Sequence, residues 1–383
     1  MIKARSYLFD CPKGARRIVL VLALTVTAFG QHTLATREFF YAGGNYGGPP
    51  LKEVMVGQMY VEVLRPQRVT QKYPIVFFHG GGQTATNWMG TPDGRAGWAD
   101  YFLAQGYVVY LTDQPARGRS PWNDSGNGPL TMPASGRIER QFTAPEIFGA
   151  WPQAKKHTQW PGQGERKGRR GDPIFDAFYA TQVQGLSSGG VETQTLVRSA
   201  GTALLDKIGP AILVTHSQAG PFGWLLADSR PKAIKAIIAV EPSGPPFRNT
   251  VVNVGNEDKA RSWGVADIPL TYLPPAEKES DLAPVREQGA DGPNLAICWK
   301  QPDPPRQLPN LKGIPILIIS TEASYHALYD HCTSKYLKQA GVQNTHMRLE
   351  ELGIHGNGHM VMLEKNNIEV ATVLQKWISA HVK

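Results

Sequence analysis

Ser217 stands where a serine nucleophile on a sharp turn is expected. An apolar run at residues 211–215 leads into Thr-His-Ser-Gln-Ala-Gly at 215–220, and a helical segment follows. A strand, a tight turn at serine and a helix expose the serine Oγ above a sheet and direct the helix N-terminus at developing negative charge. Thr215 and Ala219 occupy positions where glycine is common, but both side chains are small. The segment therefore predicts nucleophilic catalysis by Ser217.

A run of glycines upstream of this turn could supply backbone donors. The apolar run 74–79 leads directly into Gly80, Gly81 and Gly82. Glycines let backbone N–H groups turn toward the oxyanion of a tetrahedral intermediate, and the N–H of Gln218 would be a further donor. A glycine run alone is weak evidence, but ahead of the serine turn in the same chain it predicts an oxyanion hole of Gly81, Gly82 and Gln218.

Two histidines near the C-terminus are candidates for the general base. His355 and His359 flank Gly-Asn-Gly at 356–358, after the last expected strand. Catalytic residues on this type of sheet follow the chain order serine, acid, histidine, with the histidine on a loop after the final strand. Both residues qualify. Position favours His359, because it ends the flexible stretch beside the terminal helix.

Two glutamates are candidates for the acid. Glu241 ends the apolar run after the serine turn, and Glu322 ends the following run. Either carboxylate could accept the Nδ1–H of the base and stabilise the imidazolium that forms. The more frequent position of the acid slightly favours Glu322, whereas the uninterrupted apolar run before Glu241 should end beside the serine turn. Strand order and spacing leave the choice open.

Short apolar runs and helical segments alternate along the chain. The runs have few polar breaks, as expected for strands covered on both faces. Alternation of strands and helices predicts an α/β fold, with a mostly parallel sheet between two layers of helices. The predicted strands are 74–79, 107–112, 211–215, 234–240, 314–320 and 345–352, and the predicted helices are 97–105, 191–208, 221–227, 327–340 and 367–382.

Two long segments, 120–190 and 247–309, interrupt this alternation. Structureless connections of such length in a compact domain are usually lids or binding segments, so both are predicted to be cap-like insertions. Near the N-terminus, residues 41–50 are rich in glycine and proline and predict a loop. Residues 54–64 alternate apolar and polar side chains, as the arm of a β-hairpin would.

The N-terminus has the features of a secretory signal peptide. Five basic side chains come first, an apolar run follows at 18–29, and small residues lead up to Ala35. This run is shorter than the roughly 20 apolar residues that span a bilayer, so no stable membrane anchor is predicted. Residues 1–35 are predicted to be removed, which leaves a domain at 36–383 that is periplasmic or secreted. The removed segment also carries one acid, so the net charge of +8 falls to about +4.

The cysteine count and the basic residues add two expectations. Cys11 would leave with the signal peptide, so Cys298 and Cys332 remain. Two thiols in an oxidising compartment normally form a disulfide, and two free buried thiols are the alternative.

A basic cluster at 155–170 has no nucleic-acid-binding pattern around it, so it predicts a solvated loop and no nucleic-acid partner.

Seven sequence blocks resemble the secreted bacterial esterases of the α/β-hydrolase superfamily, in the esterase 713-like group. The blocks are HGGGQTATNW at 79–88, TPDGR at 91–95, DQPARGRS at 113–120, THSQAG at 215–220, VEPSGPPF at 240–247, TEASYHALYDHC at 321–332 and GNGHMVMLEKNN at 356–367. The resemblance implies a triad of Ser217, Glu241 and His359 and a bridge between Cys298 and Cys332. The chain departs from the group in a longer stretch at 261–293 and in the lack of an adjacent cysteine pair in the oxyanion loop.

These features together predict a serine carboxylic-ester hydrolase. His359 would remove the proton of Ser217, backbone donors would hold the oxyanion, and water would cleave the acyl-enzyme. The expected partner is a small-molecule ester, neither a metal nor an organic cofactor is implied, and a homodimer is left open. Hydrolysis of a lactone, an amide or a carbon–carbon bond on the same fold is the alternative. A second alternative is a non-catalytic binding protein on the same fold, although such proteins usually lack a triad member.

Overall fold

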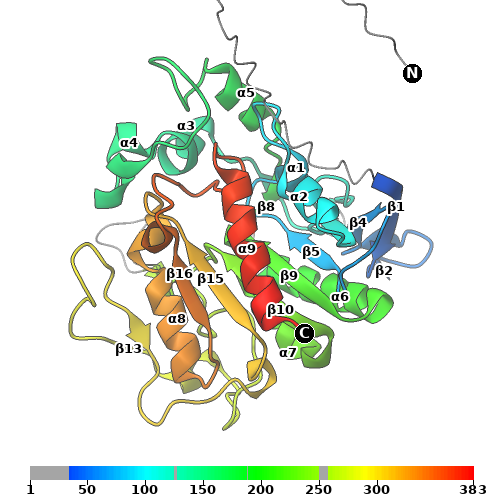
Figure 1. The fold of residues 1–383 in the computed structure, drawn as a ribbon. Coiled ribbons are helices and arrows are strands. Elements are labelled where there is room, and N and C mark those ends of the chain that lie inside the picture. Colours follow the sequence, from blue (N-terminus) through cyan, green and yellow to red (C-terminus); the bar gives the residue numbers. More distant parts are fainter. Residues whose placement is uncertain (1–33, 125–126, 188, 250–257) are drawn as a thin grey trace, which may run out of the picture. The chain divides into compact units, whose positions relative to one another are not determined.

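A mixed eight-stranded sheet forms the centre of the computed structural model, which describes residues 34–124, 127–187, 189–249 and 258–383 (Figure 1). Its strand order is β1-β4-β6-β5-β9-β10-β15-β16. Strand β4 is antiparallel to both of its neighbours, and all pairs from β6 to β16 are parallel. The predicted mostly parallel sheet is confirmed. The strands are β1 Leu34–Ala42, β4 Met59–Pro66, β5 Ile75–Phe78, β6 Val109–Asp113, β9 Ala211–His216, β10 Ile234–Val240, β15 Ile316–Ser320 and β16 Thr345–Arg348.

Helices cover both faces of this sheet. Helices α6 (Gly190–Ile208), α7 (Gly220–Ser229) and α8 (Asp330–Gln339) pack on one face, and α2 (Trp98–Ala104) and α9 (Asn367–His381) pack on the other (Figure 1). Successive strand side chains point to opposite faces and join separate hydrophobic clusters. Phe78, Leu213 and Ile237 belong to the first cluster, and Phe77, Val214 and Ile238 belong to the second. Burial on both faces explains why these strands appear in the sequence as unbroken apolar runs.

The N-terminal region differs from its sequence-based prediction. Residues 41–50 are not all loop, because β1 extends to Ala42 and β2 spans Asn45–Gly47. The expected hairpin arm at 54–64 is present, but a break at Gly57, whose φ is +78°, divides it into two strands. The first, β3 (Val54–Val56), pairs with β2, whereas β4 joins the main sheet beside β1. The pairs Ala42–Met59 and Asn45–Val56 keep one antiparallel register across this break, so residues 54–64 form the arm of a hairpin with β1 and β2, as predicted.

The C-terminal strand is also shorter than expected. Strand β16 ends at Arg348, and Leu349–Leu352 forms a 3₁₀ turn that leads into the loop with the two candidate histidines. The other predicted strands and helices lie within a few residues of the expected bounds. One predicted helix, 327–340, begins as a 3₁₀ turn at Tyr325–Leu328 before α8.

The first long insertion is built from short helices above the sheet (Figure 1). Its aromatic side chains Trp160, Phe175 and Phe178 are buried in the cluster beneath α2 and α9. This packing fixes the insertion to the sheet domain. Its elements are β7 Leu130–Thr131, α3 Ser135–Ile138, a π-helical turn Glu139–Thr143, α4 Pro145–Phe148, a 3₁₀ turn Pro152–Lys156, α5 Pro173–Ala180 and β8 Gly185–Leu186.

The second insertion packs on the α8 side of the molecule. Tyr272 is buried, and its hydroxyl lies 2.7 Å from the hydroxyl of Tyr336 on α8. A disulfide joins Cys298 to Cys332 of α8 with Cα atoms 5.2 Å apart, which confirms the predicted bridge. Closing a loop of 34 residues stabilises the fold by about 3 to 4 kcal/mol in the chain-entropy model. The short strands here are β11 Arg248–Asn249, β12 Asp258–Lys259, β13 Val285–Arg286 and β14 Trp299–Lys300.

The predicted signal peptide lies outside the described residues except for Leu34 and Ala35, which begin β1. From Leu34 onward, no described helix combines the length and the apolar character needed to cross a bilayer.

Candidate active site

Ser217 occupies a strained turn between β9 and α7. It directly follows β9, and its φ of +53° is uncommon for a residue with a side chain. The turn is held from the next strand, since Ser243 N donates a hydrogen bond of 2.8 Å to Ser217 O. Gly220 permits this approach, because a Cβ there would lie 2.4 Å from the Cβ of Pro242. The local backbone therefore has the geometry expected of a nucleophile turn.

The glycine run lies against this turn. A Cβ at Gly80 would lie 3.1 Å from Ser217 Cβ and 2.8 Å from His216 Nδ1, so only glycine fits there without displacement. Gly81 and Gly82 line the same cavity as Ser217 and Gln218. The N–H groups of these two glycines donate no hydrogen bond to another described residue. They are therefore free to bind an oxygen in the cavity.

His359 and Glu241 form a fully buried pair. His359 Nδ1 lies 2.6 Å from Glu241 Oε2, and neither side chain is exposed. Glu241 directly follows β10 and also accepts hydrogen bonds from Thr321 N (2.9 Å), Thr321 Oγ1 (2.6 Å) and Ser324 Oγ (2.7 Å). Burial raises the pKa of Glu241, whereas these donors oppose that rise by favouring the carboxylate.

The other ring nitrogen of His359 faces Tyr325. Burial and the nearby His326 lower the pKa of His359 well below its usual value, so the imidazole is neutral at neutral pH. With Nδ1–H donated to Glu241, Nε2 is an acceptor. It lies 3.5 Å from the hydroxyl of Tyr325, whose side chain also interacts with that of Ser217. Within the described part of the chain, Ser217 and His359 make no direct hydrogen bond, and Tyr325 stands between them.

Tyr325 did not emerge from the sequence as a site residue. It lies in a 3₁₀ turn after β15, inside the block TEASYHALYDHC. Nothing in the spacing of that block distinguishes Tyr325 from Tyr329. Only the fold shows that Tyr325 lines the cavity of Ser217.

The alternative candidates, His355 and Glu322, form a separate pair. His355 Nδ1 lies 3.1 Å from Glu322 Oε2, with side chains 63% and 12% exposed. Glu322 also accepts a hydrogen bond of 2.9 Å from Lys156 Nζ. None of these three residues lines the cavity that contains Ser217. The structure thus brings His359 together with Glu241 and places the other two candidates in a different environment.

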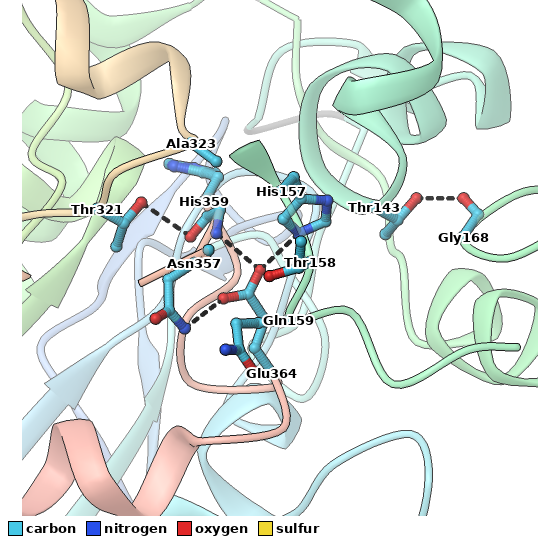
Figure 2. Close-up of polar contacts among 12 residues, drawn as sticks. Thr143, His157, Thr158, Gln159, Gly168, Thr321, Ala323, Asn357, His359 and Glu364 are labelled. Atoms are coloured by element: carbon cyan, nitrogen blue, oxygen red, sulfur yellow. Dashed lines mark hydrogen bonds and ion pairs between the residues drawn. The ribbon is translucent and has the colours of Figure 1, made fainter. Parts of the chain in front are cut away.

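Glu364 holds the loop that carries His359 (Figure 2). Its Oε1 accepts hydrogen bonds from Gly358 N and from His157 Nε2, both of 2.8 Å, and its Oε2 accepts one of 2.7 Å from Asn357. His157 belongs to the first insertion, and its Nδ1 lies 2.7 Å from Glu146 Oε2. Burial lowers the pKa of His157, but the two carboxylates outweigh it and raise the pKa to about 9. A charged histidine therefore joins the insertion to the histidine loop, and the sequence contained no signal for this link.

Three groups of side chains in the described residues have the spacing of metal ligands, but all are already engaged. In one of them, Glu287 and Asp291 form ion pairs with Lys335, and Cys298 is part of the disulfide. Cys298 and Cys332, which lie near His331, are joined by the disulfide. Glu241 and His359 cluster with His326, whose ring nitrogens contact Asp330 and Tyr329 at 3.0 Å. Glu241, His326 and His359 are thus satisfied by protein partners.

The cavity over Ser217 has a volume of about 380 Å³. Its walls come from the glycine loop, the serine turn, Tyr325 and the first insertion, which contributes Met132, Pro133, Ile138 and Phe142 among others. The Phe142 ring also packs against the ring of His359, with 4.8 Å between the two ring centroids. A cavity of this size suits a small ligand.

A family model described as the alpha/beta hydrolase fold matches residues 73–269, just over half of the chain, including the glycine loop, Ser217 and Glu241. The chain belongs to the α/β-hydrolase family. This α/β-hydrolase is 47% identical over 346 residues to the "Probable secreted lipase phiG" of Fungal sp. (strain ATCC 74256), with 89% of each chain covered. Its fold is similar to that of a structure titled as a novel bacterial esterase, with a TM-score of 0.59 and 24% identity over 92% of this chain and 97% of that one. At that identity the likeness shows a shared fold.

Proposed function

We propose that this α/β-hydrolase is a secreted serine carboxylic-ester hydrolase in which Ser217, His359 and Glu241 form the catalytic triad. Ester hydrolysis and secretion are supported by the relationship to a protein named as a probable secreted lipase. The observation that carries the triad is the geometry at Ser217. Its strained turn shares a cavity with the unpaired N–H groups of Gly81 and Gly82, and the hydrogen-bonded His359–Glu241 pair lies behind Tyr325.

In the proposed reaction, His359 Nε2 takes the proton of Ser217 Oγ as the oxygen attacks the ester carbonyl. For this step Nε2 must exchange its long contact with Tyr325 for one with Ser217, a tightening that substrate binding commonly brings. The backbone N–H groups of Gly81, Gly82 and Gln218 hold the oxyanion, and one such donor is typically worth roughly 10² to 10³ in rate. The imidazolium then protonates the leaving alcohol, and water cleaves the acyl-enzyme with His359 again as base.

Glu241 would act on His359 rather than on the substrate. Its carboxylate holds the imidazole by Nδ1, which directs Nε2 toward the cavity, and stabilises the imidazolium that forms. Thr321 and Ser324 fix the carboxylate through both of its oxygens. The network therefore orients the base before substrate arrives.

Within the α/β-hydrolase family, we propose that the chain belongs to the esterase 713-like group, and the seven sequence blocks support this assignment. We further propose that residues 1–35 are a secretion signal and that the two insertions act as caps. The first insertion supplies walls of the cavity, whereas none of the described residues of the second one lines it. The fungal origin of the curated relative offers no support for a periplasmic location over a fully secreted one.

The test is hydrolysis of a panel of p-nitrophenyl esters, lactones and amides by the mature protein and by Ser217→Ala. We expect turnover of short esters that falls by at least about 10³-fold in the variant, because the nucleophile is lost. Ser229→Ala, at the far end of α7, is the matched control and should hydrolyse the same esters at the normal rate. Full activity of Ser217→Ala, or a preference for lactones or amides over all esters, would contradict the proposal.

A further inference from the structure

Arg117 is a buried guanidinium without a carboxylate partner. Its residue is 5% exposed, yet it lines the cavity that contains Ser217 and Gln218. Its Nη1 donates to two neutral acceptors, Gly80 O at 3.2 Å and Gln218 Oε1 at 3.0 Å. Across the described residues, no carboxylate oxygen lies within 4.0 Å of this guanidinium, and its Nε and Nη2 donate no hydrogen bond.

The nearby carboxylates are committed to another arginine. Arg119 forms ion pairs with Asp113, at 2.8 Å, and with Glu62. Asp113 also accepts hydrogen bonds from the backbone N–H groups of Ala85 and Arg119. The two arginines thus differ in their charge balance: carboxylates of the protein neutralise Arg119, whereas Arg117 has only neutral acceptors.

Arg117 remains charged in this buried position. Burial lowers its pKa to about 10, with the charge of Asp113 opposing, so the guanidinium is still protonated at neutral pH. Burial together with the Arg117 charge lowers the pKa of His79 to about 4, so the adjacent imidazole is neutral and adds no positive charge. An unpaired buried charge is costly to a protein, and a ligand of opposite charge would relieve that cost.

The cavity is shaped and charged for an anion. Arg137, which is exposed, lines it together with Arg117, and no aspartate or glutamate of the described chain does so. Gly185 leaves room for the guanidinium, since a Cβ there would lie 2.2 Å from Arg117 Nη2. The apolar side chains of Met132, Ile138 and Phe142 offer a surface for a short aliphatic chain.

We propose that the substrate of this esterase is an ester that also carries a carboxylate, and that Arg117 binds this carboxylate with help from Arg137. The inference rests on the proposed function, because it places the scissile carbonyl at Ser217. A planar guanidinium with free Nε and Nη2 groups matches the two oxygens of a carboxylate. Arg117 is the only buried cation among the described residues that line the cavity, and solvent screens the charge of the exposed Arg137. The site therefore balances about one negative charge, which favours a carboxylate over a doubly charged phosphate.

The test compares pairs of esters that differ only in charge. Monoethyl esters of malonate, succinate and glutarate are paired with the corresponding ester amides, and O-acetyl lactate is paired with O-acetyl lactamide for a charge on the alcohol side. We expect kcat/KM for the carboxylate to exceed that for its amide by roughly 10- to 100-fold in at least one pair, as is typical of hydrogen bonds to a charged group. Equal rates within every pair would overturn the proposal.

Variants then assign the preference to Arg117. In Arg117→Gln the ratio of kcat/KM for the carboxylate ester to kcat/KM for its amide should fall toward one. In Arg117→Lys this ratio should be intermediate, because the paired donors of the guanidinium are lost but the positive charge remains. Arg140→Gln removes the same charge from an exposed arginine that does not line the cavity, and should leave the ratio unchanged. A role of Arg117 in merely positioning Gly80 and Gln218 would lower both rates equally, and an unchanged ratio in Arg117→Gln would therefore overturn the assignment.

Failure of this inference is distinguishable from failure of the proposed function. Neutral esters hydrolysed in a Ser217-dependent manner without any preference for the carboxylate would contradict the substrate class alone. Ester hydrolysis that survives in Ser217→Ala would contradict the proposed function, whatever the preference.

Discussion

Two histidines four residues apart on one loop contact a glutamate through the same atom, Nδ1, but in different surroundings. The His359–Glu241 pair is fully buried at 2.6 Å, whereas the His355–Glu322 pair is at 3.1 Å with the histidine 63% exposed. In water such a pair is weak and mobile, because solvent screens the charges and the side chains lose entropy on pairing. In the interior, the donors around Glu241 hold its carboxylate, and through it the His359 ring, in one geometry. The residue types are equal, and burial decides which pair can orient a base.

The difference between the two histidine–glutamate pairs follows from the order of the strands in the sheet. Glu241 directly follows β10, the neighbour of β9 in the sheet, so it lies beside the serine turn. Glu322 follows β15, which is one strand further from β9. The loop that follows β16 contacts Thr321 through Gly358 O, and its later histidine pairs with Glu241 and packs against Phe142 of the first insertion.

The largest expected effect distinguishes the two glutamates. Glu241→Gln should lower kcat for a short p-nitrophenyl ester by about 10⁴, because the imidazole loses its orienting carboxylate and the imidazolium its stabilising charge. Glu322→Gln is the matched control and should stay within a few-fold of the wild type. Steady-state kinetics with circular dichroism to verify folding provide the measurement. Near-normal turnover in the first variant with collapse in the second would transfer the acid role to Glu322.

A second expected effect concerns His157, which joins the first insertion to Glu364 behind the His359 loop. Its pKa is raised from 6.5 to about 9 on folding, so its stabilising effect is complete below pH 6.5 and is lost as the pH rises through 9. His157→Gln should therefore reduce the free energy of unfolding at pH 6 by about 3 kcal/mol, and the difference from wild type should shrink by pH 9.5.

Urea denaturation of wild type and His157→Gln at several pH values measures this dependence. His381→Gln, which removes an imidazole from the end of α9, is a control whose effect should not follow the same pH course. A loss of stability in His157→Gln that is constant from pH 6 to pH 9.5 would show that the charge of His157 contributes nothing.

The smallest expected effect is at the exposed pair. His355→Gln should change the free energy of unfolding by less than about 1 kcal/mol and kcat by less than about twofold, because solvent-exposed ion pairs contribute little. The same denaturation and kinetic measurements apply. A loss of several kcal/mol, or a large fall in kcat, would mean that exposure does not separate the two pairs as described.

Local sequence pattern was sufficient for much of the fold. The apolar runs at 74–79, 211–215 and 234–240 are central strands, because burial on both faces requires unbroken apolar sequence. The serine turn and the glycine run were also visible, since each depends on a few consecutive residues. With Cys11 in the predicted signal peptide, only Cys298 and Cys332 remained to pair, and they do.

The tertiary structure alone decided what depends on contacts between distant segments. Glu241 and His359 are 118 residues apart. Position favoured His359 and the family resemblance implied both residues, but only the fold shows that their side chains are in contact. The same limit hid Tyr325 between His359 and Ser217, and His157 against Glu364, 207 residues away. Periodicity shows which face of a strand or helix is buried, but strand order and the packing of insertions determine which polar groups meet inside. Those arrangements depend on the whole chain, so the sequence by itself identified the candidates and the fold shows which of them are in contact.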